Sequence, residues 1–206
     1  MQRTILIVIF LSALSLAFAQ QPLALTNAGL EVDANKDGLP DGWSRYVSNG
    51  TAQTSVDTGV KHAGEGALWV DCAPASRCTV SQLVPVADAG QFTFGCWLKT
   101  DLPAGSSAHV YIQWRKGKGE AVLNEKPSPI LTGKQDWTEI SCVGTKPADA
   151  EGALLVIVVQ TAQGKPGTAW ADDAWFKAGA FPKGPTPPPA PAAPAAGPGQ
   201  IANGSF

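Results

Sequence analysis

Short runs of alternating apolar and polar residues fill the middle of the chain. They are rich in Val, Ile, Thr, Phe and Trp and are bounded by Gly, Pro, Asp and Ser, which is typical of β-strands. No segment keeps the helical apolar period of about 3.6 residues. The predicted strands are Gly66–Asp71, Thr79–Pro85, Gln91–Thr100, His109–Arg115, Asp136–Val143, Leu154–Gln160 and Ala169–Lys177, with a further extended segment over Thr51–Thr58.

The alternation also assigns faces to these strands. Gln91–Thr100 and His109–Arg115 each have one apolar face, predicted to lie in the core, and one face that mixes aromatic and polar groups. Leu154–Val159 is apolar on both faces and is predicted to be a central strand. Many strands without intervening helices predict an all-β sandwich of antiparallel sheets. The predicted core positions are Phe92, Phe94, Cys96, Leu98, Val110, Ile112 and Trp114.

The N-terminal 19 residues have the pattern of a secretion signal. Arg3 supplies a positive charge, an apolar stretch runs from Ile5 to Leu16, and Ala17-Phe18-Ala19 is a small-x-small cleavage site. The apolar stretch is too short to span a bilayer, so we expect no membrane insertion. The sequence therefore predicts an extracellular, periplasmic or cell-surface protein; the alternative is an uncleaved N-terminal membrane helix.

The composition changes abruptly near residue 183. Residues 20–182 are predicted to form one folded module, and residues 183–199 a Pro/Ala-rich extended linker. Residues 201–206 are similar to residues 25–30, which predicts that residues 200–206 are the truncated start of a second module. A chance match between short strings is the alternative. We thus expect a monomeric module within a multi-domain chain.

The charge balance excludes some partners. The formal net charge is −2 at pH 7, and cleavage after residue 19 would remove one cation, Arg3, and no acid. A weakly acidic chain lacks the basic surface that nucleic acids and anionic membranes require. Neither is an expected partner.

Four cysteines lie in a chain predicted to reach an oxidising compartment, which favours disulfides. Three pairings are open. Cys72–Cys78 is the favoured one because a short loop joins two strand-like runs, and it leaves Cys96–Cys142. A metal site is the alternative, but there is no C-x-x-C motif and no nearby His.

Asp33 to Asp41 resembles the first half of a calcium loop. Oxygen-bearing side chains at alternate positions are followed by Gly38, which would make the sharp turn. The bidentate Glu expected at the twelfth position is replaced by Ser44, and no helical pattern flanks the loop, so this is not an EF-hand. A metal-free Asp/Asn/Gly turn is the alternative. The candidate ligands for Ca²⁺ are Asp33, Asn35, Asp37 and Asp41.

Five short motifs follow one another in order along the chain. They are Asn27-Ala28-Gly29-Leu30-Glu31, Asp41-Gly42-Trp43, His62-Ala63-Gly64-Glu65-Gly66-Ala67-Leu68, Phe92–Lys99 and Ala169-Trp170-Ala171-Asp172-Asp173-Ala174-Trp175-Phe176. Together they resemble the jelly-roll carbohydrate-binding modules of the xylan- and cellulose-binding type, with a galactose-binding-like fold. The resemblance covers about residues 25–178, and it implies a jelly-roll β-sandwich that binds polysaccharide.

The resemblance also implies a structural Ca²⁺ held by Glu31 and by Asp172 or Asp173, together with backbone carbonyls. Strict alternation would send Asp172 and Asp173 to opposite faces, so that only one of them looks into the sandwich. The alternative is a solvated turn acid beside a carboxylate that accepts backbone N–H groups.

Tryptophan is frequent, with seven Trp against two Tyr. Sugar rings pack with their flat C–H faces on indole, while amide and guanidinium groups bind hydroxyls. Trp97 and the side chains of His109–Arg115 that alternate away from the core are predicted to share one face with Lys99. For any single Trp, burial in the core is the competing interpretation. The candidate ligand-binding residues are Trp97, Tyr111, Gln113, Arg115 and Gln160.

Nothing in the sequence favours catalysis. The two histidines, His62 and His109, lie outside every nucleophile or metalloprotease motif. The sequence therefore predicts a non-catalytic glycan-binding module with a structural calcium ion. The alternatives are an adhesive or structural β-sandwich without a sugar site and the ancillary domain of a truncated glycoside hydrolase.

Overall fold

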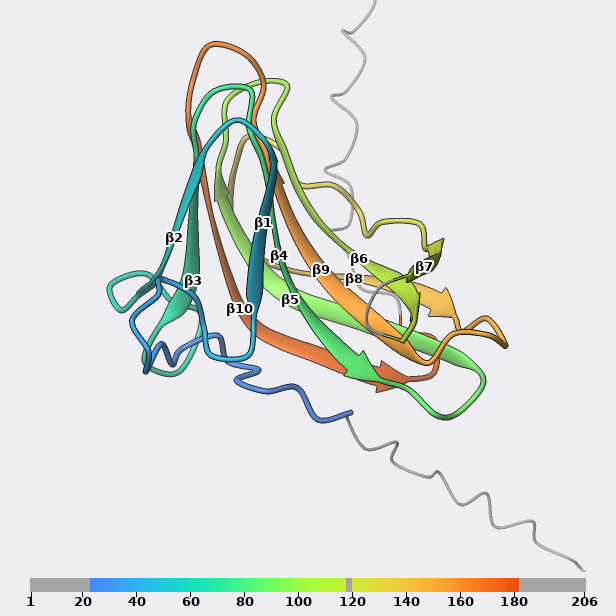
Figure 1. The fold of residues 1–206 in the computed structure, drawn as a ribbon. Helices are drawn as coiled ribbons and strands as arrows, with labels where there is room; N and C mark the ends of the chain where they lie inside the picture. Colours follow the sequence, from blue (N-terminus) through green and yellow to red (C-terminus); the bar gives the residue numbers. More distant parts are fainter. Residues whose placement is uncertain (1–22, 118–119, 182–206) are drawn as a thin grey trace, which may run out of the picture.

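The computed structural model describes residues 23–117 and 120–181, which form ten strands and no helix (Figure 1). Two five-stranded antiparallel sheets stack face to face, with the strand orders β1-β4-β9-β6-β7 and β2-β3-β10-β5-β8. We call them the first and second sheet. The strands are β1 Ser44–Asn49, β2 Ala52–Asp57, β3 Ala67–Cys72, β4 Arg77–Pro85, β5 Gln91–Asp101, β6 Ser107–Lys116, β7 Glu120–Asn124, β8 Lys134–Thr145, β9 Gly152–Gln160 and β10 Gly167–Ala178.

The predicted antiparallel sandwich is confirmed, and each predicted strand is present with ends shifted by a few residues. β9, which is apolar on both faces, lies at the centre of the first sheet as expected. The sequence pattern did not predict β1 and β7. Both are edge strands of the first sheet, and β1 is almost wholly exposed, so its sequence carries no apolar alternation.

The core lies between the inner faces of the two sheets. The inward positions predicted for β5 and β6 are all buried, with at most 2% of each side chain exposed. Phe92 stacks on Phe176 with ring centroids 5.6 Å apart and meets Trp114 edge to face at 5.7 Å. Aromatic rings in these arrangements supply much of the buried apolar area of a sandwich this size.

The cysteines differ from the prediction. All four are buried free thiols, so the disulfides predicted for Cys72–Cys78 and Cys96–Cys142 are not formed in the structure. Each lies at an inward strand position, where it packs as a small apolar residue. A hydrogen bond to Cys78 and burial raise the pKa of Cys72, and burial raises the pKa of Cys96.

The secretion signal (1–19), the linker (183–199) and the tail (200–206) lie outside the described residues. Within the described ranges, no helix has the length and apolar character needed to cross a bilayer.

Candidate functional site

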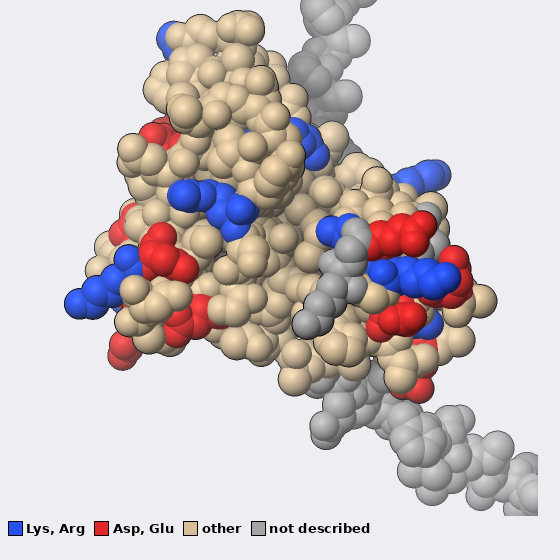
Figure 2. Space-filling view, viewed as in Figure 1, with Lys and Arg blue, Asp and Glu red and all other residues tan. Residues whose placement is uncertain are grey.

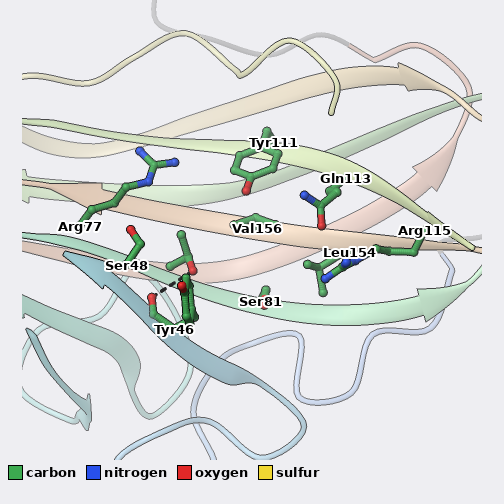
Figure 3. Close-up of a pocket in the computed structure, with 10 residues that line it drawn as sticks. Tyr46, Ser48, Arg77, Ser81, Tyr111, Gln113, Arg115, Leu154 and Val156 are labelled. Carbon is green, nitrogen blue, oxygen red and sulfur yellow. Dashed lines mark hydrogen bonds between the residues drawn. The ribbon is translucent and has the colours of Figure 1, made fainter. Parts of the chain in front are cut away.

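A groove of about 430 Å³ runs along the outer face of the first sheet. Figure 2 views this side of the molecule and shows a hollowed surface that is mainly uncharged, with most acidic side chains near the rims. Four strands contribute to the groove: β1, β4, β9 and β6. The lining residues are Tyr46, Ser48, Arg77, Thr79, Ser81, Tyr111, Gln113, Arg115, Leu154 and Val156 (Figure 3).

Strand register places two tyrosines on opposite sides of this groove. Tyr46 on β1 pairs with Thr79 on β4, while Tyr111 on β6 pairs with Val156 on β9. β1 and β6 are three strand spacings apart, roughly 14 Å. Tyr46 is 68% exposed although it is a large aromatic residue, so its ring is available to a ligand.

The groove floor is apolar and its ends carry polar groups. Leu154 and Val156 on β9 form the floor between the two sides. Figure 3 shows Arg77 toward one end and Arg115 toward the other, with Gln113 between them. A surface with flat aromatic rings, an apolar floor and fixed hydrogen-bonding groups fits a ligand that is both apolar and hydroxylated.

Two of the polar side chains are held in place by neighbours. Arg77 donates from Nη1 to Oε1 of Gln160 at 2.8 Å, and Gln113 donates from Nε2 to Oδ1 of Asn124 at 2.7 Å. Side chains that are already oriented lose less conformational entropy when a ligand binds. The groove is therefore partly preorganised.

The structure brings together four of the five predicted ligand-binding residues. Tyr111, Gln113 and Arg115 alternate along one face of β6 and line the groove, and Gln160 supports it through Arg77. The groove residues on β1 and β4 were not predicted from the sequence. The alternation of Thr79 and Ser81 with buried Cys78 and Val80 could have indicated the β4 contribution, whereas β1 gave no signal.

The placement of Trp97 and Lys99 beside Tyr111 was wrong. Both lie on β5, which belongs to the second sheet, whereas β6 belongs to the first. Strands adjacent in the sequence lie in different sheets here because the chain crosses from one layer to the other between Asp101 and Ser107. Trp97 instead stacks on His62, with ring centroids 3.9 Å apart.

The prediction that Asp172 and Asp173 point to opposite faces was also wrong. The β10 pairing with β5 skips from Asp172 to Trp175, and Asp173 has a positive φ of 47°, which is the geometry of a bulge. Both carboxylates consequently reach His62: Asp172 accepts its backbone N–H at 2.8 Å, and Asp173 contacts its Nδ1 at 2.7 Å.

Asp172 is fully buried beneath residues 62–63. It also accepts the backbone N–H groups of Ala63 at 3.1 Å and of Asp173 at 2.7 Å. Burial raises the pKa of Asp172, although these N–H groups act in the opposite direction. The carboxylate ties the loop before β3 to the bulge in β10.

Glu31 lies against the same loop. Gly64 has a positive φ of 59°, and a Cβ at this position would overlap the Glu31 carboxylate. Glycine is therefore needed at position 64 for both its backbone conformation and its size. Glu31 and Asp172 thus approach one short segment, residues 62–64, from different parts of the chain.

The Asp33–Asp41 segment folds into a turn held by its own side chains. Asp33 accepts the backbone N–H groups of Asp37 at 3.1 Å and of Gly38 at 3.0 Å, and Asn35 donates to Asp37 at 3.1 Å. Asp41 accepts the N–H of Ala34 at 3.2 Å. Over the described ranges, no group of three or more His, Cys, Asp or Glu residues is arranged as a metal-binding cluster.

His109 lies beside Tyr111 on the outer face of β6, and burial, with a smaller contribution from Arg77, lowers its pKa from 6.5 to about 4. Among the described residues, its buried Nδ1 has no hydrogen-bond partner. Because the unfolded chain takes up this proton below pH 6.5 and the folded chain only near pH 4, the free energy of unfolding should fall as the pH drops through that window. Because the imidazole is partly exposed, solvent screening reduces the effect, and the expected loss for His109 is on the order of 1 kcal/mol.

Urea unfolding of the wild type and His109→Phe at pH 7 and pH 4.5 checks this expectation. The raised pKa of Asp172 acts in the opposite sense, adding stability as the pH falls, but it is present in both proteins and cancels in the difference. The variant should lose less stability on acidification than the wild type. Equal losses would contradict the assignment.

The sequence matches no protein-family model and no curated protein. The fold, in contrast, is similar to that of solved jelly-roll β-sandwiches, among them carbohydrate-binding modules. The CBM22-1 xylan-binding domain of Xyn10C from Paenibacillus barcinonensis superimposes with a TM-score of 0.52 at 14% identity, covering 78% of this chain and 96% of that one.

Two further structures share the fold. A carbohydrate-binding module of the β-sandwich superfamily with promiscuous specificity has a TM-score of 0.52 at 18% identity, covering 71% of this chain and 60% of that one. The enzymatically active domain of tailspike protein 4 from bacteriophage CBA120 has a TM-score of 0.53 at 14% identity, covering 71% of this chain and only 21% of that one. The predicted jelly-roll fold is confirmed.

Proposed function

We propose that this chain is an exported, non-catalytic module that binds polysaccharide in the groove of the first sheet. The observation that carries the proposal is the pair of tyrosines, Tyr46 and Tyr111, on opposite sides of an apolar floor. Each phenol ring offers a flat face to the C–H side of a pyranose ring. Arg77 and Gln113 offer donors to its hydroxyls.

The solved counterparts support this choice of ligand. One is a xylan-binding domain and another is a carbohydrate-binding module of promiscuous specificity. The leader-like residues 1–19 support export from the cytoplasm, and an exported protein can reach polysaccharides outside the cell. The groove lining contains aromatic, hydroxyl, amide and guanidinium groups, a set suited to holding a glycan without breaking a bond.

A glycan array tests the proposed function. Purified residues 20–206 should retain at least one β-linked polysaccharide, with xylan as the first probe. The double variant Tyr46→Ala/Tyr111→Ala should lose the groove-bound ligand while keeping its thermal unfolding, because Tyr46 is largely exposed and Tyr111 lies on the outer face. If the wild type retains no glycan, the proposed function is wrong.

We also propose that calcium stabilises the loops at the end of the sandwich where the described chain begins. Glu31 and Asp172 flank residues 62–64, and the turn from Asp33 to Asp41 gathers further carboxylate oxygens, the ligand type that Ca²⁺ prefers. Bound calcium would offset the repulsion among these carboxylates and hold the loops together.

Thermal unfolding in calcium and in chelator checks the calcium proposal. A ligand that binds only the folded state stabilises it by about 2.7 kcal/mol at 100 times its dissociation constant. Glu31→Gln and Asp33→Asn should each be measured, because the variant that abolishes the calcium response identifies the site. Asp149→Asn, an exposed acid between β8 and β9, is the matched control. An unfolding temperature that is the same in calcium and chelator would rule the proposal out.

A further inference from the structure

Five of the seven tryptophans lie on the outer face of the second sheet, on the opposite side of the sandwich from the groove. The other two, Trp43 and Trp114, are buried. The five are half-buried, and solvent-facing sheet positions rarely carry so many large rings without an interaction role. They are Trp69, Trp97, Trp137, Trp170 and Trp175.

Neighbours within the chain account for three of these rings. Trp97 and Trp137 both contact the imidazole of His62, at 3.9 Å and 5.8 Å between ring centroids. Trp175 lies over Gly95, where a Cβ would meet its ring, and Nζ of Lys177 lies 4.8 Å from its centroid. These contacts give the three rings a structural role.

Trp170 is in a different position. It pairs with Trp69 across β3 and with Lys99 across β5, and its Nε1 donates to Oδ2 of Asp57 at 2.9 Å. This hydrogen bond holds the pKa of Asp57 below its ordinary value and fixes the orientation of the indole. Trp170 also lines a hollow of about 500 Å³.

The other walls of this hollow are polar and of mixed charge. Lys99 and Asp136 form an ion pair at 2.6 Å, and Thr100, Asp101, Lys134 and Gln135 also line the hollow. The Asp136 side chain is 84% exposed, so its second oxygen faces solvent while the first is bonded to Lys99. Cationic and acidic side chains alternate around the hollow. A ligand with a net positive or a net negative charge would therefore lie beside a side chain of the same charge.

We infer that this hollow is a second saccharide-binding site, in which a neutral sugar ring packs on Trp170 and its hydroxyls bind Asp136, Gln135 and Lys99. A fixed aromatic ring beside several donors and acceptors suits a neutral, hydroxylated ring. A protein partner fits less well, because the centre of a protein interface is depleted of charged residues. The site shares no residue with the groove and does not depend on the groove's function.

Two sites on opposite faces make the chain bivalent. Each face can hold a different polysaccharide chain. On an insoluble polysaccharide, binding at one site raises the effective concentration of ligand at the other site, so the two sites together bind more tightly than either alone. The proposal therefore predicts two sugar-binding sites per chain. It also predicts that the loss of either site weakens the binding of the protein to insoluble polysaccharide.

The test uses residues 20–206 in four forms on a panel of neutral polysaccharides containing xylan, galactan and mixed-linkage glucan. The forms are the wild type, the groove variant Tyr46→Ala/Tyr111→Ala, the hollow variant Gln135→Ala/Asp136→Ala, and the combination of both. The hollow variant changes exposed residues and should leave thermal unfolding unchanged. Asp149→Ala, an exposed acid beyond the opposite end of β8, is the matched control.

The groove variant should still bind at least one panel member, and adding the hollow substitutions should weaken that binding at least fivefold. Trp170→Phe, which keeps a ring but loses the bond to Asp57, should weaken it less than Trp170→Ala. If the groove variant binds nothing while the wild type binds, the second site does not exist and the proposed groove function stands. Residual binding that the hollow substitutions leave unchanged would also overturn the inference. If the hollow substitutions abolish polysaccharide binding and the groove substitutions leave it unchanged, the second site is supported and the proposed function of the groove is contradicted.

Discussion

Replacing Trp114 with alanine should lower the free energy of unfolding by about 3–5 kcal/mol. Trp114 is fully buried on the inward face of β6, packs edge-on against Phe92, and donates its indole N–H to Oε1 of Glu125 at 2.7 Å. The substitution leaves a large cavity between the sheets and removes a donor from a partly buried carboxylate. Urea unfolding followed by circular dichroism measures the loss.

Trp114→Phe separates the two contributions. It keeps most of the packing but cannot donate to Glu125, which also accepts the backbone N–H of Thr145 at 2.8 Å. We expect a smaller loss, about 1–3 kcal/mol. Trp175→Ala on the outer face should cost less than Trp114→Ala because its ring is only half-buried. If Trp114→Ala lowers the free energy of unfolding by less than Trp175→Ala does, the position assigned to Trp114 in the core is contradicted.

Replacing Tyr111 with alanine should weaken the binding of the oligosaccharide that occupies the groove by about tenfold. That factor corresponds to about 1.4 kcal/mol, the order expected when one stacked aromatic ring is removed. Tyr111 lies directly beside Val156 of the floor and opposite Tyr46, so its ring borders the ligand path. Isothermal titration with oligosaccharides of the polysaccharide found on the array measures the change.

Two variants control this prediction. Tyr111→Phe keeps the ring and should change the affinity by less than about threefold, because the stacked face is preserved. Trp97→Ala should leave groove affinity unchanged, because Trp97 lies on the second sheet. An equal effect of Tyr111→Ala and Trp97→Ala would mean that the loss reflects general destabilisation and not a contact in the groove.

Local alternation predicted the central strands well. In β5 and β6 the apolar and polar positions alternate because one face of each strand lies in the core, whereas β9 is apolar on both faces because it lies at the centre of its sheet. The edge strands of the first sheet were not predicted, because a strand without a buried face carries no such pattern. β1 buries almost nothing, so no apolar pattern marks it, although it supplies Tyr46 and Ser48 to the groove.

The candidate site was only partly predictable because it depends on long-range strand pairing. Alternation placed Tyr111, Gln113 and Arg115 on one face of β6 correctly. It could not reveal that β5 and β6 belong to different sheets, which removes Trp97 from the groove. Arg77 and Thr79 reach the groove through the pairing of β4 with β9, which no local pattern encodes.

The acidic pair was misplaced by a backbone irregularity. The bulge at Asp173 inserts a residue into β10 and breaks the two-residue period on which face assignment rests. Aspartate adopts a positive φ more often than most residues, but two adjacent aspartates do not indicate which of them forms the bulge. Glu31 and Asp172, which the resemblance named together, both approach residues 62–64, and their role as calcium ligands stays a prediction.

Chemical-shift mapping by NMR tests the central claim most directly. Isotopically labelled residues 20–206 are titrated with the oligosaccharide that the array identifies, under conditions that saturate the tighter site. The amides perturbed first should belong to the outward positions of β1, β4, β9 and β6 around Tyr46, Thr79, Val156 and Tyr111. Perturbations confined to the second sheet, or none at saturating sugar, would contradict the assignment of the groove as the principal glycan-binding site.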